Sequence, residues 1–253
     1  MTSIGLIKRL SDASELVASR IKEVGRIQKS HIHPVKIYIA LHQYGKGRGD
    51  KGSLTWNPDP QIVAALDAAF TLSFANVEKT NKRFYLGLDV SSSMGCGTIA
   101  GIEGLTPALG TALLAMVTAR TEDRVVIKGF TGQMQDLGIT SADSLKVAQK
   151  KVSNHNFGPT DCALPMLDAL QEKLNVDCFV VMTDNESRCG AVHPRVALER
   201  YRQKMGIASK LVVVGMTSTG FTIADPNDSS SLDVVGFDTN VPSLISEFAA
   251  GRF

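Results

Sequence analysis

The sequence predicts an α/β fold, in which a doubly wound, mostly parallel sheet covered by helices follows a short all-helical segment. After about residue 82, apolar runs of strand length alternate with helical patterns, as in β-α-β units. These strand runs are apolar almost throughout, which is typical of strands covered on both faces. Before residue 82, the apolar residues recur at helical spacing. We therefore expect two domains, residues 1–82 and 83–253.

The first segment contains three helical patterns. Apolar residues recur at spacings of three, four and seven over 4–27, and further helices are expected over 35–44 and 62–70. Pro34 precedes the second of these helices and Gly45 follows it, as helix start and stop signals do. Ser11 and Asp12 offer an alternative for the first range, because they can cap a second helix inside it.

The second domain contains four clear strand patterns and five helical ones. The expected strands are Phe84–Asp89, Arg124–Phe130, Cys178–Thr183 and Leu211–Gly215, with a short edge strand at Met134–Ile139. The expected helices are Leu105–Arg120, Ser144–Ser153, Leu164–Lys173, His193–Met205 and Pro242–Ala250. About 170 residues with four or five parallel strands suit a doubly wound domain.

Composition indicates a globular protein of the cytoplasm. The chain has 253 residues, 43% hydrophobic and 21% charged, and no run approaches the roughly 18 apolar residues of a membrane helix. Its start lacks the long apolar stretch of a secretory signal. The four cysteines show no Cys-x-x-Cys spacing, so we expect reduced thiols rather than disulfides or a zinc site: Cys96, Cys162, Cys178 and Cys189.

Charge is distributed unevenly along the chain. Residues 1–82 hold 12 lysines and arginines against 7 acidic residues, a net charge of +5, whereas residues 83–253 carry −3. The basic segment either meets phosphate backbones or is a solvated helix surface. Within it, Lys46, Arg48 and Lys51 alternate with glycines in a loop that can approach phosphates closely, and they are the candidate RNA-binding residues.

One motif carries the strongest chemical signal. Asp89, Ser91 and Ser93 follow the first strand at positions i, i+2 and i+4. A carboxylate and two hydroxyls then stand at the carboxyl edge of a sheet, where open α/β folds bind ligands. Oxygen donors suit Mg²⁺ or Mn²⁺. The competing interpretation is a serine-rich helix cap.

Two later stretches add donors to the same edge. Thr160 precedes the Leu164 helix, and Asp184 ends the strand at Cys178–Thr183. Asp89, Ser91, Ser93, Thr160 and Asp184 are therefore the candidate metal ligands, directly or through water. Mg²⁺ normally takes only one or two carboxylates from a protein, which leaves room for an acidic group of a partner.

The order Asp-x-Ser-x-Ser, threonine, aspartate resembles the metal-ion-dependent adhesion site of von Willebrand factor A domains. Flanking stretches are similar to the Ro ribonucleoprotein autoantigen family, in which a TROVE module precedes such a domain. Similarity extends over residues 84–94, 158–166, 179–186, 192–198, 201–205 and 215–226, and the stretches 32–41 and 56–60 resemble the end of the TROVE module.

The resemblance implies a ring of helical repeats that binds small noncoding RNAs and acts in RNA quality control, joined to the A domain. At 253 residues the chain is too short for the ring, so residues 1–82 resemble only its last helices. What carries over by residue is the metal site. We expect a non-catalytic binding module that takes an acidic protein ligand at its metal, with RNA as a partner through the ring.

Two further expectations concern catalysis and assembly. The alternative function is a Mg²⁺-dependent phosphoryl-transfer or hydrolytic enzyme, since such enzymes also place aspartates at strand ends. It is disfavoured because the residue two after Asp89 is Ser91, not a second aspartate. Helices taken from a ring expose apolar faces, so we expect self-association or pairing with a ring-bearing chain.

Overall fold

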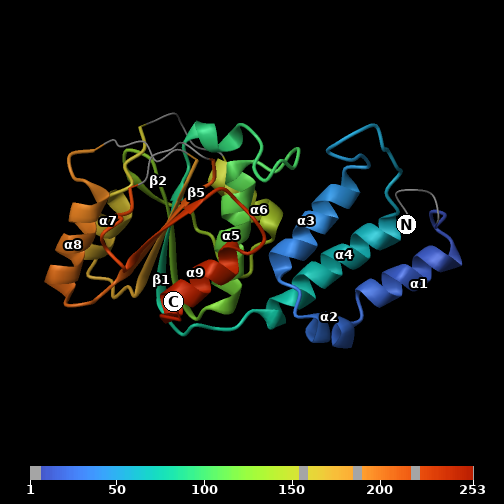
Figure 1. The fold of residues 1–253 in the computed structure, drawn as a ribbon, viewed down its shortest axis with the longest axis horizontal. Helices are drawn as coiled ribbons and strands as arrows, with labels where there is room; N and C mark the ends of the chain where they lie inside the picture. Colours follow the sequence, from blue (N-terminus) through green and yellow to red (C-terminus); the bar gives the residue numbers. More distant parts are fainter. Residues whose placement is uncertain (1–6, 154–158, 185–189, 218–222, 253) are drawn as a thin grey trace. The chain divides into compact units, whose positions relative to one another are not determined.

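The computed structural model describes residues 7–153, 159–184, 190–217 and 223–252. The chain divides into two compact units, residues 1–78 and 79–253. Cys189 and Gly158 lie outside the described residues. Each unit is described by itself below, with the elements labelled as in Figure 1.

The first unit is helical. Its elements are α1 (Asp12–Ile21), α2 (Val24–Ser30), α3 (Pro34–Gly45), α4 (Pro60–Leu72) and the short helix η2 (Ser73–Asn76). The single helix expected over residues 4–27 is wrong, and the alternative is confirmed. The Ser11 side chain caps α1 by accepting from the Ser14 amide, and a second helix begins at Val24.

The first unit is organised around α4, which lies between α1 and α3 (Figure 1). Ala18 of α1 packs on Ile62 and Ala65 of α4 to form a small core. Asp59 is buried at the start of α4, where one carboxylate oxygen accepts from the Gln61 amide and the other from the Leu10 amide. This aspartate therefore joins the segment before α1 to α4.

The second unit is a six-stranded sheet with the order β3-β2-β1-β4-β5-β6. The strands are β1 (Arg83–Asp89), β2 (Arg124–Phe130), β3 (Met134–Asp136), β4 (Cys178–Thr183), β5 (Lys210–Gly215) and β6 (Ser231–Val235). All neighbours are parallel except β2 and β3. The predicted doubly wound, mostly parallel sheet is confirmed. Strand β6 was not predicted, because Ser231 and Asp233 interrupt its apolar pattern.

Helices cover both faces of this sheet (Figure 1). They are α5 (Pro107–Thr121), α6 (Leu145–Ser153), α7 (Leu164–Gln171), α8 (Pro194–Met205) and α9 (Val241–Ala250), with the short helix η3 (Ser92–Gly95) after β1. Helices α7 and α8 pack on one face through a cluster that includes Tyr85, Phe179 and Tyr201. Helices α5, α6 and α9 lie on the other face. Strand β1 is consequently buried over residues 84–89.

The segment before β1 belongs to the second unit. The Thr80 and Asn81 amides donate to the two carboxylate oxygens of Glu122, at 2.7 and 3.2 Å, and Lys79 pairs with Asp123. These contacts tie residues 79–81 to the turn between α5 and β2. Among the described helices, none is long and apolar enough to cross a membrane.

Candidate metal centre

The candidate centre begins where β1 ends. Asp89 is fully buried, and its Oδ1 accepts a 2.8 Å hydrogen bond from the Ser91 amide. This contact turns the chain from the strand into η3. The hydroxyl oxygens of Ser91 and Ser93 consequently lie 3.0 Å apart. The loop therefore gathers one carboxylate and two hydroxyls at the carboxyl end of a central strand.

Strand β4 brings a second group of oxygens to this edge. It pairs in parallel with β1, with Leu88 opposite Met182, so the ends of the two strands are adjacent. Thr183 is fully buried and donates from Oγ1 to Oδ2 of Asp89 at 2.6 Å. Asp184 follows, and its backbone carbonyl accepts from the Thr217 hydroxyl, just after β5. Both oxygens of Asp89 are thus held by hydrogen bonds.

Thr183 was not among the predicted site residues. Its signal in the sequence is a hydroxyl at the end of a strand that neighbours the Asp89 strand. That signal can be used only once the pairing of β1 with β4 is known, because the pairing decides which side chain meets the carboxylate.

Thr160 reaches the same edge from the segment before α7. The amide of its neighbour Asp161 donates to the carbonyl of Thr131, immediately after β2, at 3.0 Å. The Asp161 side chain accepts from the Ala163 amide, so it caps the turn that enters α7. Thr160 itself is 8% exposed. All five predicted ligands therefore lie at the carboxyl edge of the sheet.

A glycine in β1 allows α7 to approach the sheet here. A Cβ atom on Gly87 would lie 2.5 Å from Cγ of Pro165, in the first turn of α7. Pro165 thus occupies the space that any other residue at position 87 would fill. The position of α7, and with it that of the Thr160 segment, depends on this contact two residues before Asp89.

Electrostatics favour a cation at this edge. Burial raises the pKa of Asp89, hydrogen bonds from Thr183 and Ser91 oppose the rise, and the charge of Asp184 adds to it. Asp184 is also buried, and within the described residues neither carboxylate has a basic partner. Two neighbouring buried carboxylates without a counter-charge are costly unless a cation or a proton neutralises the pair.

The donor set discriminates between metals. Across the described ranges, no three His, Cys, Asp or Glu side chains gather into a metal-binding group. Two carboxylates with hydroxyls form an oxygen-only set, which fits Mg²⁺ or Mn²⁺ better than Zn²⁺. The residues present therefore fit a hard divalent cation.

The predicted RNA-binding residues lie in the other unit. Lys46 pairs with Asp50 at the end of α3. Arg48 opposes Thr55 in a short antiparallel turn, which Trp56 anchors by donating from Nε1 to the carbonyl of Tyr44 at 2.8 Å. Arg48 and Lys51 are exposed. The loop is thus an anchored turn that presents two cations, and its RNA contact stays a prediction.

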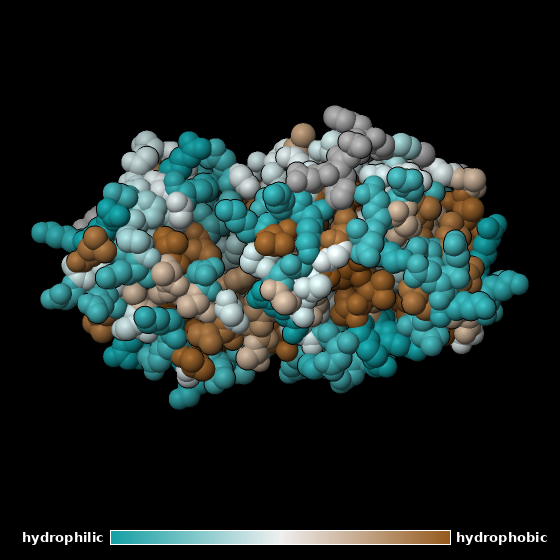
Figure 2. Space-filling view, turned by 180° about the vertical axis from the view of Figure 1, so that it is seen from behind, coloured by the Kyte–Doolittle hydropathy of each residue, from teal (hydrophilic) through white to brown (hydrophobic). Residues whose placement is uncertain are grey.

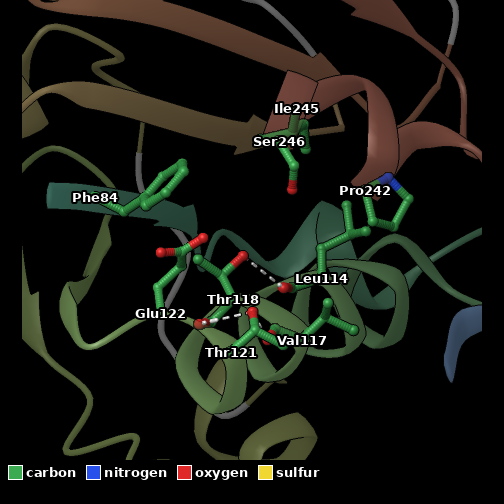
Figure 3. A pocket seen from close by; sticks show the side chains of 9 residues that line it. All are labelled: Phe84, Leu114, Val117, Thr118, Thr121, Glu122, Pro242, Ile245 and Ser246. Carbon is green, nitrogen blue, oxygen red and sulfur yellow. Dashed lines mark hydrogen bonds between the residues drawn. The ribbon is translucent and has the colours of Figure 1, made fainter. Parts of the chain in front are cut away.

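A small pocket lies near the beginning of β1 (Figure 3). It is lined by Phe84, Glu122 and residues of α5 and α9, and its cavity volume is about 10 Å³. That space holds about one water molecule. This pocket is therefore too small for an organic ligand, and the carboxyl edge is the better candidate site.

Comparisons with known proteins agree with the fold of the second unit. The sequence model of the family described as "Ro60 vWA domain" matches residues 83–249. The chain belongs to the Ro60 vWA domain family. The predicted resemblance is thereby confirmed, and the Ro60-type domain accounts for the whole sheet with its flanking helices.

Individual relatives extend the similarity into the helical unit. The RNA-binding protein RO60 of Deinococcus radiodurans is 48% identical over 238 residues, which are 94% of this chain and 45% of the relative. The Caenorhabditis elegans protein of the same name is 36% identical over 248 residues, 98% of this chain and 36% of the relative. The crystal structure of the Deinococcus radiodurans RO (RSR) protein superposes with a TM-score of 0.94 at 45% identity, covering 100% of this chain and 51% of that one. The chain thus spans about half or less of each relative.

Proposed function

We propose that the Ro60-type domain is a non-catalytic binding module that holds one Mg²⁺ or Mn²⁺ ion. Asp89, Ser91, Ser93, Thr160 and Asp184 hold the ion, directly or through water. The supporting observation is the buried Asp89 carboxylate beside Asp184, with no basic partner among the described residues. When bound, the cation supplies a Lewis-acidic position for a carboxylate from a partner protein.

Isothermal titration with Mg²⁺ and with Mn²⁺ tests the metal site. Asp89→Ala is expected to abolish binding. Asp136→Ala is the matched control, because Asp136 also accepts from the amide two residues later but lies at the end of the edge strand β3. Failure of the unaltered chain to bind either metal, or unchanged binding by Asp89→Ala, would refute the proposal.

The proposal extends to RNA. Two relatives are named RNA-binding proteins, and the helical unit of this chain carries the basic excess. We assign this unit a part in binding small noncoding RNA within a Ro-like ribonucleoprotein that serves RNA quality control. Arg48 and Lys51, exposed on their anchored turn, are the residues through which it would contact phosphates.

Fluorescence polarisation with labelled single-stranded RNA at two salt concentrations tests this part. Affinity should fall as salt rises, and Arg48→Ala with Lys51→Ala should weaken binding and flatten the salt dependence. Lys146→Ala with Lys150→Ala removes the same charge from exposed positions of α6 and should have little effect. If both double variants lose RNA affinity equally, binding depends on the net charge of the chain and not on a contact with Arg48 and Lys51.

A further inference from the structure

An apolar groove opens on the helical unit. Its cavity volume is about 460 Å³, within the range of sites that bind ligands, and it runs from the end of α1 across α2 and α3 onto α4. Ile27, Ile37 and Leu66 contribute to its apolar wall. Apolar side chains also reach the surface in several patches of this unit (Figure 2). Of the eight large apolar side chains that are clearly exposed among the described residues, five belong to it: Leu10, Leu16, Val24, Ile32 and Leu54.

The charged residues that line the groove are all basic. They are Arg20, Arg26 and Lys36, and the first two share one acidic partner, Glu23, at 3.5 and 2.6 Å. With Glu23 counted, the rim still carries a net charge of +2. An apolar wall with a cationic rim fits an occupant that combines aliphatic and acidic side chains.

The lining favours a polypeptide over RNA as that occupant. Proteins that hold single-stranded RNA stack its bases on aromatic side chains. No aromatic side chain is among the described residues that line the groove. Aliphatic walls of this kind accept the apolar face of a helix instead.

The outer face of α1 has the complementary chemistry. Asp12, Glu15, Leu16 and Ser19 follow one another at i, i+3, i+4 and i+7 and are all exposed, Leu16 by 58%. The opposite face of the same helix packs on α4 through Val17 and Ala18. The α1 stripe, residues 12, 15, 16 and 19, thus presents one aliphatic side chain beside two carboxylates.

We propose that the groove of one copy of this chain receives the α1 stripe of a second copy. Leu16 would enter the apolar wall, and Asp12 and Glu15 would meet the basic rim. The two surfaces differ, so the contact is heterologous and leaves a free groove at one end and a free stripe at the other. Assembly consequently continues beyond a dimer unless the contact geometry closes a ring.

Two double variants separate the halves of this interface. Lys36→Glu with Ala40→Glu blocks the groove, and both changes lie at exposed positions of α3. Glu15→Lys with Leu16→Lys blocks the stripe. Val147→Lys is the matched control, because Val147 is 42% exposed on α6 in the other unit.

Sedimentation velocity on the ribonuclease-treated full chain provides the readout. The average mass of the unaltered chain and of Val147→Lys should rise with concentration and fall with added salt. Each double variant alone should be a monomer. Mixed together, they should form a single 1:1 dimer that cannot grow, because only one groove and one stripe remain.

Three results would overturn the proposal. They are a monomeric unaltered chain at high concentration, two monomeric variants that do not combine on mixing, and an assembly that ribonuclease dissolves, which would assign the groove to RNA. Should a double variant lose its helical circular dichroism, the single changes Ala40→Glu and Leu16→Lys replace it in the same mixing scheme.

Discussion

Replacing Thr183 by valine removes one hydroxyl from the candidate centre while keeping the shape of the side chain. The lost hydrogen bond joins two fully buried groups over 2.6 Å and ends on a carboxylate. Bonds of this kind contribute about 1.5–3 kcal/mol. The bond favours the ionised form of Asp89, the form that attracts a cation, so we expect Mn²⁺ affinity to fall, with about a hundredfold as the upper limit because the same bond is also present in the metal-free protein.

Free Mn²⁺ measured by electron paramagnetic resonance gives this affinity directly. The loss should be partly reversed at higher pH, because the pKa of Asp89 rises further when Thr183 no longer donates to it. Thr183→Ser restores the donor and should bind nearly as well as the unaltered chain. Thr121→Val is a control, since it removes another buried threonine hydroxyl, one that donates to the carbonyl of Val117. If the unaltered chain binds Mn²⁺ and Thr183→Val binds it equally at every pH, the reasoning fails.

Three other outcomes follow from the same unit. Gly87→Ala should displace α7, lower the free energy of unfolding in urea by about 1–3 kcal/mol and weaken Mn²⁺ binding. Gly95→Ala is the control, because a Cβ there meets open space, and it should have none of these effects. Asp177 has its pKa lowered chiefly by hydrogen bonds from Arg83, so its contribution to stability is present above the unfolded pKa and lost as pH falls through the folded pKa. In Asp177→Asn, acid-induced unfolding should lose that part of its pH dependence, and an unchanged profile would count against the pair. The raised pKa of Asp89 means that Mn²⁺ binding should decline on acidification at a higher pH than an ordinary aspartate would give, which titration at several pH values checks. In the metal-free protein, Asp89 affects stability in the opposite direction to Asp177. Its contribution is present below the unfolded pKa and is lost as pH rises through the raised folded pKa.

Strand and helix patterns predicted most of the second unit because β1, β4 and β5 are buried over almost their whole length. The runs at Arg124–Phe130 and Cys178–Thr183 have the bounds that were expected. Strand β6 has Asp233 at its centre and lies at the sheet edge, where one side of the strand is open, so its pattern is weaker.

A helix cap could also be predicted from the sequence. Ser11 was predicted as a possible cap and is one. The structure adds His33 and His193, each followed by proline, which cap α3 and α8 by accepting from the amide two residues later. Such contacts involve neighbours along the chain, so sequence alone contains both partners.

Contacts between segments that are distant in the sequence could not be predicted in the same way. The Gly87–Pro165 approach joins residues 78 positions apart, and the Thr183–Asp89 hydrogen bond joins residues 94 positions apart. Which side chains meet across parallel strands is determined by strand order, register and the packing of the whole domain, so neither contact has both its partners within one local pattern.

The strand order has a consequence for how the centre exchanges its ligands. Asp89 ends β1 and Asp184 directly follows β4, and these are the two innermost strands, each of which has a hydrogen-bonded neighbour on both sides. Amide protons in such strands exchange with solvent only in openings close to global unfolding. Asp89 is therefore held in the part of the domain that opens most slowly and Asp184 adjoins it, whereas Ser91 and Thr160 stand on loops and Ser93 lies in the short helix η3. When a ligand enters or leaves, we therefore expect the segments that carry Ser91, Ser93 and Thr160 to move and Asp89 to keep its position.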